Sequence, residues 1–416
     1  MAGNGGSDEA DALSVGNRLK VLRTRRGMTR DVLGGLVGRS GSWVKAVETG
    51  RIAVPKLPML LRLTEALQAQ DLAELTGAQS VPIVLFAGPG HSRLPAVRAA
   101  VNQLVMPTDR PAPPVSDLQA RLRQAWAARH AAPNHREVVG ALLPGLLTDA
   151  RMLASEQIGG SQRRESLAVL AEVYALAQFF TAYQPAGDLL WRVAERGIGA
   201  AFDSGDARAI GITAWLMGQA HRDSGDWDAA DVVTTQAAAL IQSQLTSGGP
   251  ADDELAALYG ALLFETGYTA ARRGEIGNAW RYWDEADAIA QRLPAGYFHP
   301  VTSFSRAVMH AHAVTVAVEL HQGGEGVRQA QRSLSSSIPS NPRRARHWIE
   351  QARAYRLERQ HADAFHALET AYATAPETIR YNGFAREIIL EDLSVRDVRR
   401  QERAGRLARD VGLLSA

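Results

Sequence analysis

One pattern of small and apolar residues occurs twice in the middle of the chain. The segment AWLMGQAHRDSGDWDAADVV aligns with LFETGYTAARRGEIGNAWRY, so that Gly218 matches Gly267 and Gly225 matches Gly274. The same alignment pairs Trp227 with Ile276 and Ala230 with Ala279. Each segment has helical periodicity on both sides of its second glycine, and two helices approach closely where a residue carries little or no side chain. The pattern therefore predicts repeated helix hairpins.

The pattern continues toward the C-terminus, where it is clearest. The consensus spacing is met there by Trp348, Ala352, Tyr355, Ala364, Leu368, Ala371 and Pro376. Residues 167–202 and 304–334 fit more loosely. With this spacing, residues 116–416 resemble the tetratricopeptide α-solenoids, in which helix hairpins stack into a superhelix. The offset between the two central copies exceeds the usual repeat of about 34 residues, which predicts longer helices or longer turns.

The composition excludes several classes of protein. The chain has no cysteine, which rules out disulfides, zinc fingers and thiol catalysis. We find no run of about eighteen apolar residues that would span a membrane. The first 13 residues are polar and glycine-rich, unlike a signal peptide, and are expected to be disordered. We therefore expect a cytoplasmic, all-α protein.

Positive charge is concentrated near the N-terminus. Between Val15 and Lys56 there are ten basic and two acidic residues, a net charge of +8, whereas the whole chain carries only +2. A basic module on a mildly acidic remainder is typical of a chain in which one part binds a polyanion.

This basic part lies within a region, residues 14–77, that is expected to form five short helices. Thr29 and Ser40 are the expected N-caps of the second and third helices, Gly38 lies in the turn between them, and Gly50 ends the third. The expected inward side chains are Val15, Leu19, Leu22, Val32, Leu33, Leu36, Val44, Val47, Leu60, Leu61, Leu63 and Leu67. Such short amphipathic helices predict a compact helical domain.

The spacing of these elements resembles the repressor and Cro-type helix-turn-helix of the XRE family. Gly38 matches the turn of that family, and the sequence Glu48-Thr49-Gly50 matches its Glu-x-Gly close. The resemblance implies a five-helix head that binds double-stranded DNA. In this fold the third helix lies in the major groove and the second crosses the phosphate backbone.

The resemblance and the local charges together define the candidate DNA-binding residues. They are Arg30, Arg39, Ser40, Gly41, Ser42, Trp43, Lys45, Ala46, Arg51 and Lys56. Arg30 stands where the family commonly has a glutamine that binds a phosphate, and the start of its helix also attracts anions. The family's base-contacting positions fall on Gly41, Ser42 and Ala46, which departs from the usual pattern because glycine and alanine form no bidentate bonds to bases.

Three interpretations of this departure remain open. In the first, Ser42, Trp43 and Lys45 recognise the groove, with Arg39 at its edge. In the second, small residues let the helix sit deeper, so that specificity comes from DNA shape. In the third, the domain has lost DNA binding. For Trp43 itself, a ring in the groove competes with a ring in the core of the domain, and its position next to Val44 favours the groove, because adjacent helical residues face different directions.

Residues 78–115 are expected to be a linker. This stretch contains a loop around His91, a helix over residues 95–105 and the stiff proline cluster RPAPP. Its GPGHSR run lacks the glycine spacing of a dinucleotide-binding turn. We therefore expect this region to connect the two domains.

A helix-turn-helix head on such a solenoid resembles two known arrangements. One is a group of regulators in high-GC Gram-positive bacteria, and the other is the peptide-sensing quorum receptors of other Gram-positive bacteria. Projecting the repeat places Trp215, Gln219, Arg222, Phe264, Tyr268, Arg272, Ile349, Arg353 and Arg356 on the inner face of the solenoid. Arginines and aromatic rings of this kind bind carboxylates by bidentate bonds and stacking.

The identity of an effector stays open. Peptide receptors of this type favour asparagines that bond the peptide backbone, and none of the projected positions is Asn. A peptide, a small molecule, a protein partner and the absence of any ligand are the alternatives.

Catalysis is not expected. His310 and His312 are two residues apart, so on a helix they point to different sides and cannot hold one metal ion. The sequence has no metalloprotease motif, nucleophile elbow or phosphate loop. We therefore expect no cofactor. From the helix-turn-helix resemblance, we expect a homodimeric, sequence-specific transcriptional regulator. The alternative is a helical-repeat scaffold with a vestigial head.

Overall fold

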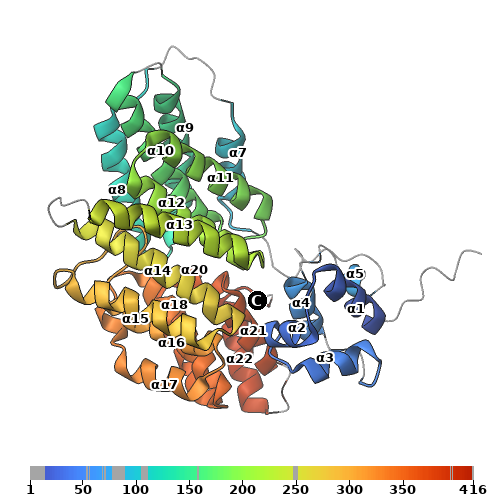
Figure 1. Cartoon of the computed structure of the whole chain (residues 1–416). Coiled ribbons are helices and arrows are strands. Elements are labelled where there is room, and N and C mark those ends of the chain that lie inside the picture. The colour runs from blue at the N-terminus through green and yellow to red at the C-terminus, as the bar shows by residue number, and fades with distance from the viewer. Residues whose placement is uncertain are drawn as a thin grey trace, which may run out of the picture. The chain divides into compact units, whose positions relative to one another are not determined.

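The computed structural model describes residues 15–52, 55, 57–67, 69, 72–76, 90–104, 111–156, 159–246, 252–393, 395 and 397–414 (Figure 1). Its contacts divide the chain into two compact units, a head that ends at Pro89 and a body from Gly90 to Ala416. Among the described residues every regular element is a helix, which confirms the expected all-α class. Residues 1–13 and Lys56 lie outside the described residues.

Within the described residues, the head contains five helices. They are α1 (Val15–Arg25), α2 (Arg30–Leu36), α3 (Gly41–Glu48), α4 (Leu57–Ala66) and α5 (Ala73–Thr76). Thr29 and Ser40 cap α2 and α3 as expected, each by accepting a hydrogen bond from a backbone N–H of the first turn. Gly38 joins the two helices with a φ of +66°, a conformation that glycine adopts without strain.

The core of the head consists mainly of apolar side chains that are buried from solvent. Its fully buried residues are Leu19, Leu33, Val44, Leu63, Leu67 and Leu75. The prediction was wrong for Val32, which is 38% exposed, and Leu36 is only half-buried. Val37 is buried instead, because it lies four residues after Leu33 and therefore shares its face of the chain.

The body contains the remaining helices. They are α7 (Leu94–Asn102), α8 (Val115–Ala131), α9 (His135–Ser155), α10 (Gly160–Thr181), α11 (Gly187–Ser204), α12 (Ala207–Asp223), α13 (Trp227–Leu245), α14 (Asp253–Arg273), α15 (Ile276–Arg292), α16 (Arg306–Glu319), α17 (Gly323–Arg332), η1 (Ser335–Ser337), α18 (Asn341–Leu357), α19 (His361–Thr374), α20 (Pro376–Arg380), α21 (Gly383–Leu393) and α22 (Val398–Asp410). From α8 to α19 they pair in sequence order as six hairpins, which lie side by side in Figure 1.

The glycines of the repeat have the roles that the sequence predicted. A β-carbon on Gly218 would lie 2.5 Å from Thr234 Cγ2 on α13, and one on Gly267 would lie 2.9 Å from Tyr282 Cβ on α15. Both glycines therefore let the two helices of a hairpin approach closely. Gly225 and Gly274 form the turns, with φ values of +84° and +82°.

The first helices of the six hairpins form a closed ring. Each of α8, α10, α12, α14 and α16 packs against the first helix of the next hairpin, and α18 packs back against α8. The expected solenoid is thus bent until its last hairpin meets its first. The repeat pattern in the sequence did not predict this closure.

Glu377 on α20 is the main polar contact across the closure. Its Oε1 atom accepts a hydrogen bond from His91 Nε2 at 3.1 Å, and its Oε2 accepts one from the backbone N–H of Arg136 at 2.5 Å. It therefore caps the start of α9 from the far end of the chain. Asn341 adds a second contact by donating to the carbonyl of Ala131 at 2.7 Å.

The linker prediction was wrong for residues 90–104, which belong to the body. Helix α7 packs against α9, and its residues Val97, Ala100 and Val101 are buried in the core of the body. The apolar face of this helix needs a partner, and α9 supplies it. His91, assigned to a loop, is 7% exposed and takes part in the closure through Glu377.

Helix α9 is the one described helix that is long and apolar enough to span a membrane by length and composition. Its residues Leu143, Leu146 and Leu147 are buried in the core that α8 and α10 also form. The helix is accordingly a core element of the body.

Candidate functional site

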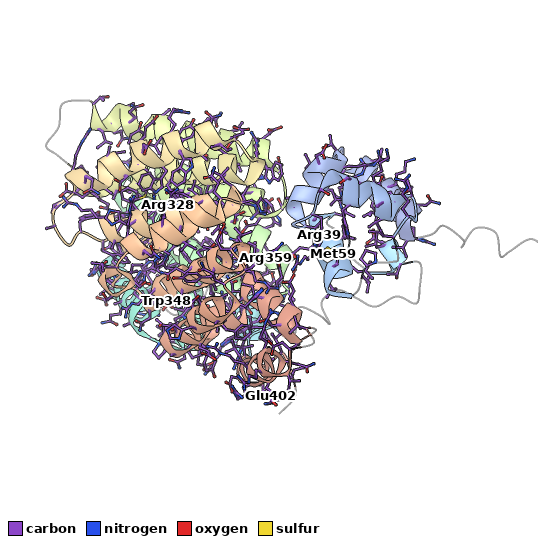
Figure 2. All side chains as sticks on the ribbon, turned by 90° about the horizontal axis from the view of Figure 1, so that it is seen from below. Arg39, Met59, Arg328, Trp348, Arg359 and Glu402 are labelled. Carbon is purple, nitrogen blue, oxygen red and sulfur yellow. The ribbon has the colours of Figure 1, made fainter. Side chains whose placement is uncertain are left out.

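The start of α3 presents exposed polar and basic side chains. Ser40 Oγ accepts a hydrogen bond from the backbone N–H of Trp43 at 3.2 Å, and it lies 2.8 Å from Ser42 Oγ. Exposed here are Arg39, Ser40, Ser42, Lys45 and Arg51, whereas Ala46 is half-buried. Figure 2 labels Arg39 on the head, and its guanidinium lies 5.7 Å from the ring of Trp43.

Gly41 is explained by packing inside the head. A β-carbon at this position would lie 1.9 Å from Asp31 Oδ1 on α2. Gly41 is itself buried, so the absence of a side chain lets the carboxylate of Asp31 lie against the first turn of α3. The contact of α2 with α3 therefore favours glycine at a position where the family contacts a base.

Trp43 is only partly in the core of the head, and its contact with a DNA groove stays a prediction. Its ring is half-buried and packs against the core of the head. The remaining surface of the ring lies near the guanidinium of Arg39.

Arg30 is engaged inside the head, with a side chain that is 37% exposed. Its Nε atom lies 2.7 Å from Oε2 of Glu48, and Arg23 Nε lies 2.6 Å from Oε1 of the same carboxylate. Burial alone would raise the pKa of Glu48, but the hydrogen bonds from Arg23 and Arg30 lower it more, so the pKa lies below its usual value. Arg30, which the sequence assigned to a DNA phosphate, is therefore already ion-paired with Glu48 inside the head.

The body contains a cavity of about 370 Å³ inside the ring of first helices. Five of the residues projected onto the inner face line it, namely Trp215, Gln219, Arg222, Phe264 and Tyr268. They come from α12 and α14, the first helices of the two central copies of the sequence repeat. The cavity also brings in side chains from α8, α9, α10, α16, α18 and α20.

Three projected arginines are not among the lining residues of the cavity. Arg353 NH1 lies 2.8 Å from Oε1 of Glu319, and Arg272 Nε lies 3.6 Å from Oε2 of the same carboxylate. Arg356 pairs with Glu391 and Asp392. Arg272 lies C-terminal to Tyr268 on α14, and Arg353 and Arg356 lie C-terminal to Glu350 on α18, so all three are beyond the last lining residue of their helix.

The face of α18 is also rotated relative to the projection. The cavity residues of this helix are Pro342, Arg343, Arg346, His347 and Glu350. Ile349, which was projected inward, is fully buried in the separate core that α18 forms with α19.

Two cavity arginines have carboxylate partners. Arg222 is ion-paired with the buried Glu265, and its guanidinium lies 4.2 Å from the ring centre of Tyr268. Arg346 NH2 lies 2.6 Å from Oε1 of Glu350. These two arginines are therefore neutralised within the protein.

The cavity is also lined by three arginines that the repeat pattern did not predict, Arg129, Arg136 and Arg343. Arg129 and Arg136 lie on α8 and α9, where no repeat was aligned, and Arg343 lies in the first turn of the last hairpin. Burial lowers the pKa of Arg343 to about 10. The pKa of Arg129 falls well below its usual value, because the side chain is buried and close to the charges of Arg343 and Arg136.

No group of three or more His, Asp or Glu side chains in the described part of the chain is arranged to hold a metal ion. The chemistry that these residues offer is recognition of anions and aromatic groups.

A comparison with protein families supports the expected helix-turn-helix identity of the head. Residues 14–76 match the family model of a helix-turn-helix domain. No curated protein matches the chain. Among solved structures, the chain is similar to a Rap protein complexed with competence and sporulation factor, at 10% identity and a TM-score of 0.44, over 72% of this chain and 78% of that one. The chain therefore carries an N-terminal, XRE-like helix-turn-helix domain, followed by a body of helix hairpins.

Proposed function

We propose that the protein is a sequence-specific, DNA-binding transcriptional regulator. The observation that carries the proposal is the start of α3, where Arg39, Ser42 and Lys45 are exposed at the end of the helix that enters the major groove in this fold. In this proposal the DNA-binding domain spans residues 14–77, and the protein acts in the cytoplasm without catalysing a reaction.

Within this proposal, the basic side chains divide into two groups. Arg39, Lys45, Arg51 and Lys56 bind phosphates, and Ser42 and Trp43 contact base edges. Phosphate contacts position the protein, whereas base contacts specify the sequence. Arg30 joins the first group only if it leaves its ion pair with Glu48.

We propose that the regulator is a homodimer whose body supplies most of the interface. Domains of this type bind half-sites about one helical turn apart, and joining two heads raises their effective concentration. Sedimentation of the full chain tests this part of the proposal. A monomer at micromolar concentration with undiminished specific binding would contradict it.

The body is proposed to sense a ligand in its cavity, either a peptide or a small molecule, or to bind a protein partner. Support comes from the five projected residues that line one cavity. Ligand binding that changes the position of the last hairpin would reach α9 through Glu377.

A salt-titrated binding assay tests the DNA-binding function. Promoter fragments selected by genome-wide mapping of bound sites are compared with random duplexes of equal length. We expect specific fragments to bind more tightly, with log K falling linearly as log salt rises. Equal binding of both, or none, would favour the alternative of an interaction scaffold with a vestigial head.

A further inference from the structure

Three arginines of the cavity lie close to Phe179 and Phe180 of α10 or to Trp215 of α12. The guanidinium of Arg129 lies 3.9 Å from the ring centre of Phe179, and Arg136 donates to the carbonyl of Phe180 at 2.6 Å. The ring of Phe179 lies 5.9 Å from that of Trp215, and the guanidinium of Arg343 lies 5.7 Å from the Trp215 ring. We call Arg129, Arg136 and Arg343 the arginine cluster.

The arginine cluster has no ion pair to a carboxylate among the described residues. The described residues that line the cavity include five arginines and three carboxylates. All three carboxylates are taken by the other two arginines, since Asp223 and Glu265 pair with Arg222, and Glu350 pairs with Arg346.

The hydrogen bonds of the cluster leave donors unused. Arg343 donates to the carbonyl of Thr302 at 3.1 Å, and Arg129 NH1 lies 3.3 Å from His130 Nδ1. The buried Nε atoms of Arg136 and Arg343 have no hydrogen-bond partner within the described residues. Glu377 is close to Arg136, but its oxygens accept from His91 and from backbone N–H groups of α9.

The position of the cluster on its helices adds to the excess of positive charge. Arg136 and Arg343 both lie in the first turn of a helix, α9 and α18. A cation is unfavourable at this end, because the helix dipole is positive there. Burial and the charge of Arg136 hold the pKa of the neighbouring His135 at about 2, so this imidazole stays neutral and does not add to the charge.

We propose that the arginine cluster binds the carboxylate of a small organic anion whose planar, apolar part lies against Phe179, Trp215 and Phe264. The inference rests on the proposed ligand-sensing role of the body. Arginine is the side chain best suited to bind a carboxylate through two parallel hydrogen bonds. The cavity volume of about 370 Å³ lies at the lower end of the range for small-molecule sites, which favours a small molecule over an extended peptide.

Aromatic side chains form the part of the cavity wall that would contact the apolar part of the ligand. Trp215 and Phe264 are 4% exposed, and the ring of His312 stacks on Phe264 at 3.8 Å. Burial lowers the pKa of His312 well below its usual value, so this ring is also neutral. Tyr183 lines the same cavity and is 56% exposed, which places the opening at the turn between α10 and α11.

The first test compares two arginines of the same helix in the unliganded full chain. Arg343→Met removes a cation without a carboxylate partner, so the melting temperature of the body should stay equal or rise. Arg346→Met is the matched control, and it should lower the melting temperature because it takes a partner from the buried Glu350. An equal fall for both variants would show that Arg343 is structural and would overturn the proposal.

The second test measures ligand stabilisation with matched probes. Benzoate should raise the melting temperature of the full-length wild type in a concentration-dependent way, whereas neutral benzamide should not. The double variant Arg129→Met/Arg343→Met should lose this response. Equal responses to benzoate and benzamide, or an undiminished response of the double variant, would overturn the proposal.

Two peptide probes distinguish the source of the carboxylate. Gly-Gly-Phe with a free C-terminus is compared with its amidated form under the same conditions. A response to benzoate alone supports a free small molecule, and a response to both carboxylates supports the end of a peptide as the source. A response to the amidated peptide equal to that of the free one would contradict recognition of a carboxylate.

DNA binding of the same samples separates this inference from the proposed function. If wild type binds no DNA specifically but responds to benzoate, the regulator proposal fails and the anion site stands. If specific DNA binding is present and the benzoate response is absent, the anion site fails alone.

Discussion

The Nε atom of Arg30 lies 2.7 Å from Oε2 of Glu48, which ties the first residue of α2 to the last residue of α3. Glu48 is 4% exposed and receives a second arginine, Arg23, from α1. Three helices of the head therefore meet at one carboxylate. The acidic residue that closes the family's motif thus fixes how the two helices of the helix-turn-helix are oriented.

Arg30→Ala should affect the stability of the head, whereas Lys45→Ala should affect DNA binding. Loss of Arg30 leaves Glu48 with one partner, so the free energy of unfolding of the head should fall by about 1–2 kcal/mol. Lys45 is exposed, so its loss should leave stability unchanged and reduce the salt slope of DNA binding by about one. Urea unfolding and salt-titrated binding of the full chain measure both quantities. A stable Arg30→Ala variant with a reduced slope would instead make Arg30 a phosphate contact.

Trp43→Ala should affect both stability and recognition. Removing a half-buried ring from the core of the head should cost about 1–2 kcal/mol of unfolding free energy. Loss of a contact with a base should weaken the free energy of specific DNA binding by about 1–3 kcal/mol. Nonspecific binding should be less affected. The control is Trp43→Phe, which keeps an aromatic ring against the core. If specific and nonspecific binding fell in parallel, Trp43 would serve the core only.

Gly41→Ala should destabilise the head through Asp31. The added methyl group would meet the carboxylate of Asp31, and moving this exposed side chain should cost about 1 kcal/mol. The double variant Asp31→Ala/Gly41→Ala should recover most of that loss. Thermal unfolding of the single and double variants checks the coupling, and strictly additive effects would exclude a direct contact.

Local features of the sequence predicted local features of the structure well. The caps at Thr29 and Ser40 and the turn glycines Gly225 and Gly274 depend on neighbours within a few residues, so a pattern is enough to find them. Five of the six positions projected from α12 and α14 line the cavity, whereas the face projected for α18 was wrong, so the repeat pattern did not predict the orientation of every helix.

Features that depend on distant contacts could not be predicted in this way. The partner of His91 is Glu377, which lies 286 residues later in the chain. Arg129 and Arg343 meet only because α18 packs on α8, and no periodicity shows that a row of hairpins closes. The glycine at position 41 is a further example, because it is explained by a contact with Asp31 on another helix.

The body should lose stability as the pH falls below 6.5. Burial lowers the pKa of His299 to about 3 from its ordinary value of 6.5. The pKa values of His130, His135 and His347 fall to about 3, 2 and 4. Between pH 6.5 and these values the unfolded chain binds protons that the folded chain does not. Each histidine should therefore cost up to about 1.4 kcal/mol per pH unit as the pH falls.

Urea unfolding at pH 7, 6 and 5 measures this dependence. His299→Asn is the informative variant, because its amide oxygen can accept the backbone hydrogen bonds that His299 Nδ1 receives from Val301 and Thr302. The variant should reduce the slope by about one proton. A body whose stability does not change over this range would contradict the buried, neutral state of these histidines.

Glu377→Ala should destabilise the body far more than the loss of a surface pair. It removes acceptors from the backbone of α9 and from His91, which should cost about 2–4 kcal/mol of unfolding free energy. The control is Arg403→Ala, which breaks an ion pair of 2.6 Å with the partly exposed Glu369 and should cost about 0–1 kcal/mol. Chemical denaturation of both variants makes the comparison, and equal losses would show that the closure adds no stability.

The closed ring of first helices has a consequence for how the body folds. In an open row of repeats each unit contacts only its neighbours, so fragments fold and melt piece by piece. Here α9 obtains its cap from α20, and the cavity obtains one wall from α18. Contacts between residues so far apart raise the contact order and slow folding, since the entropy of closing the loop must be overcome first. The first hairpins are therefore synthesised long before α18 and α20, and the cavity is complete only when α18 packs against α8.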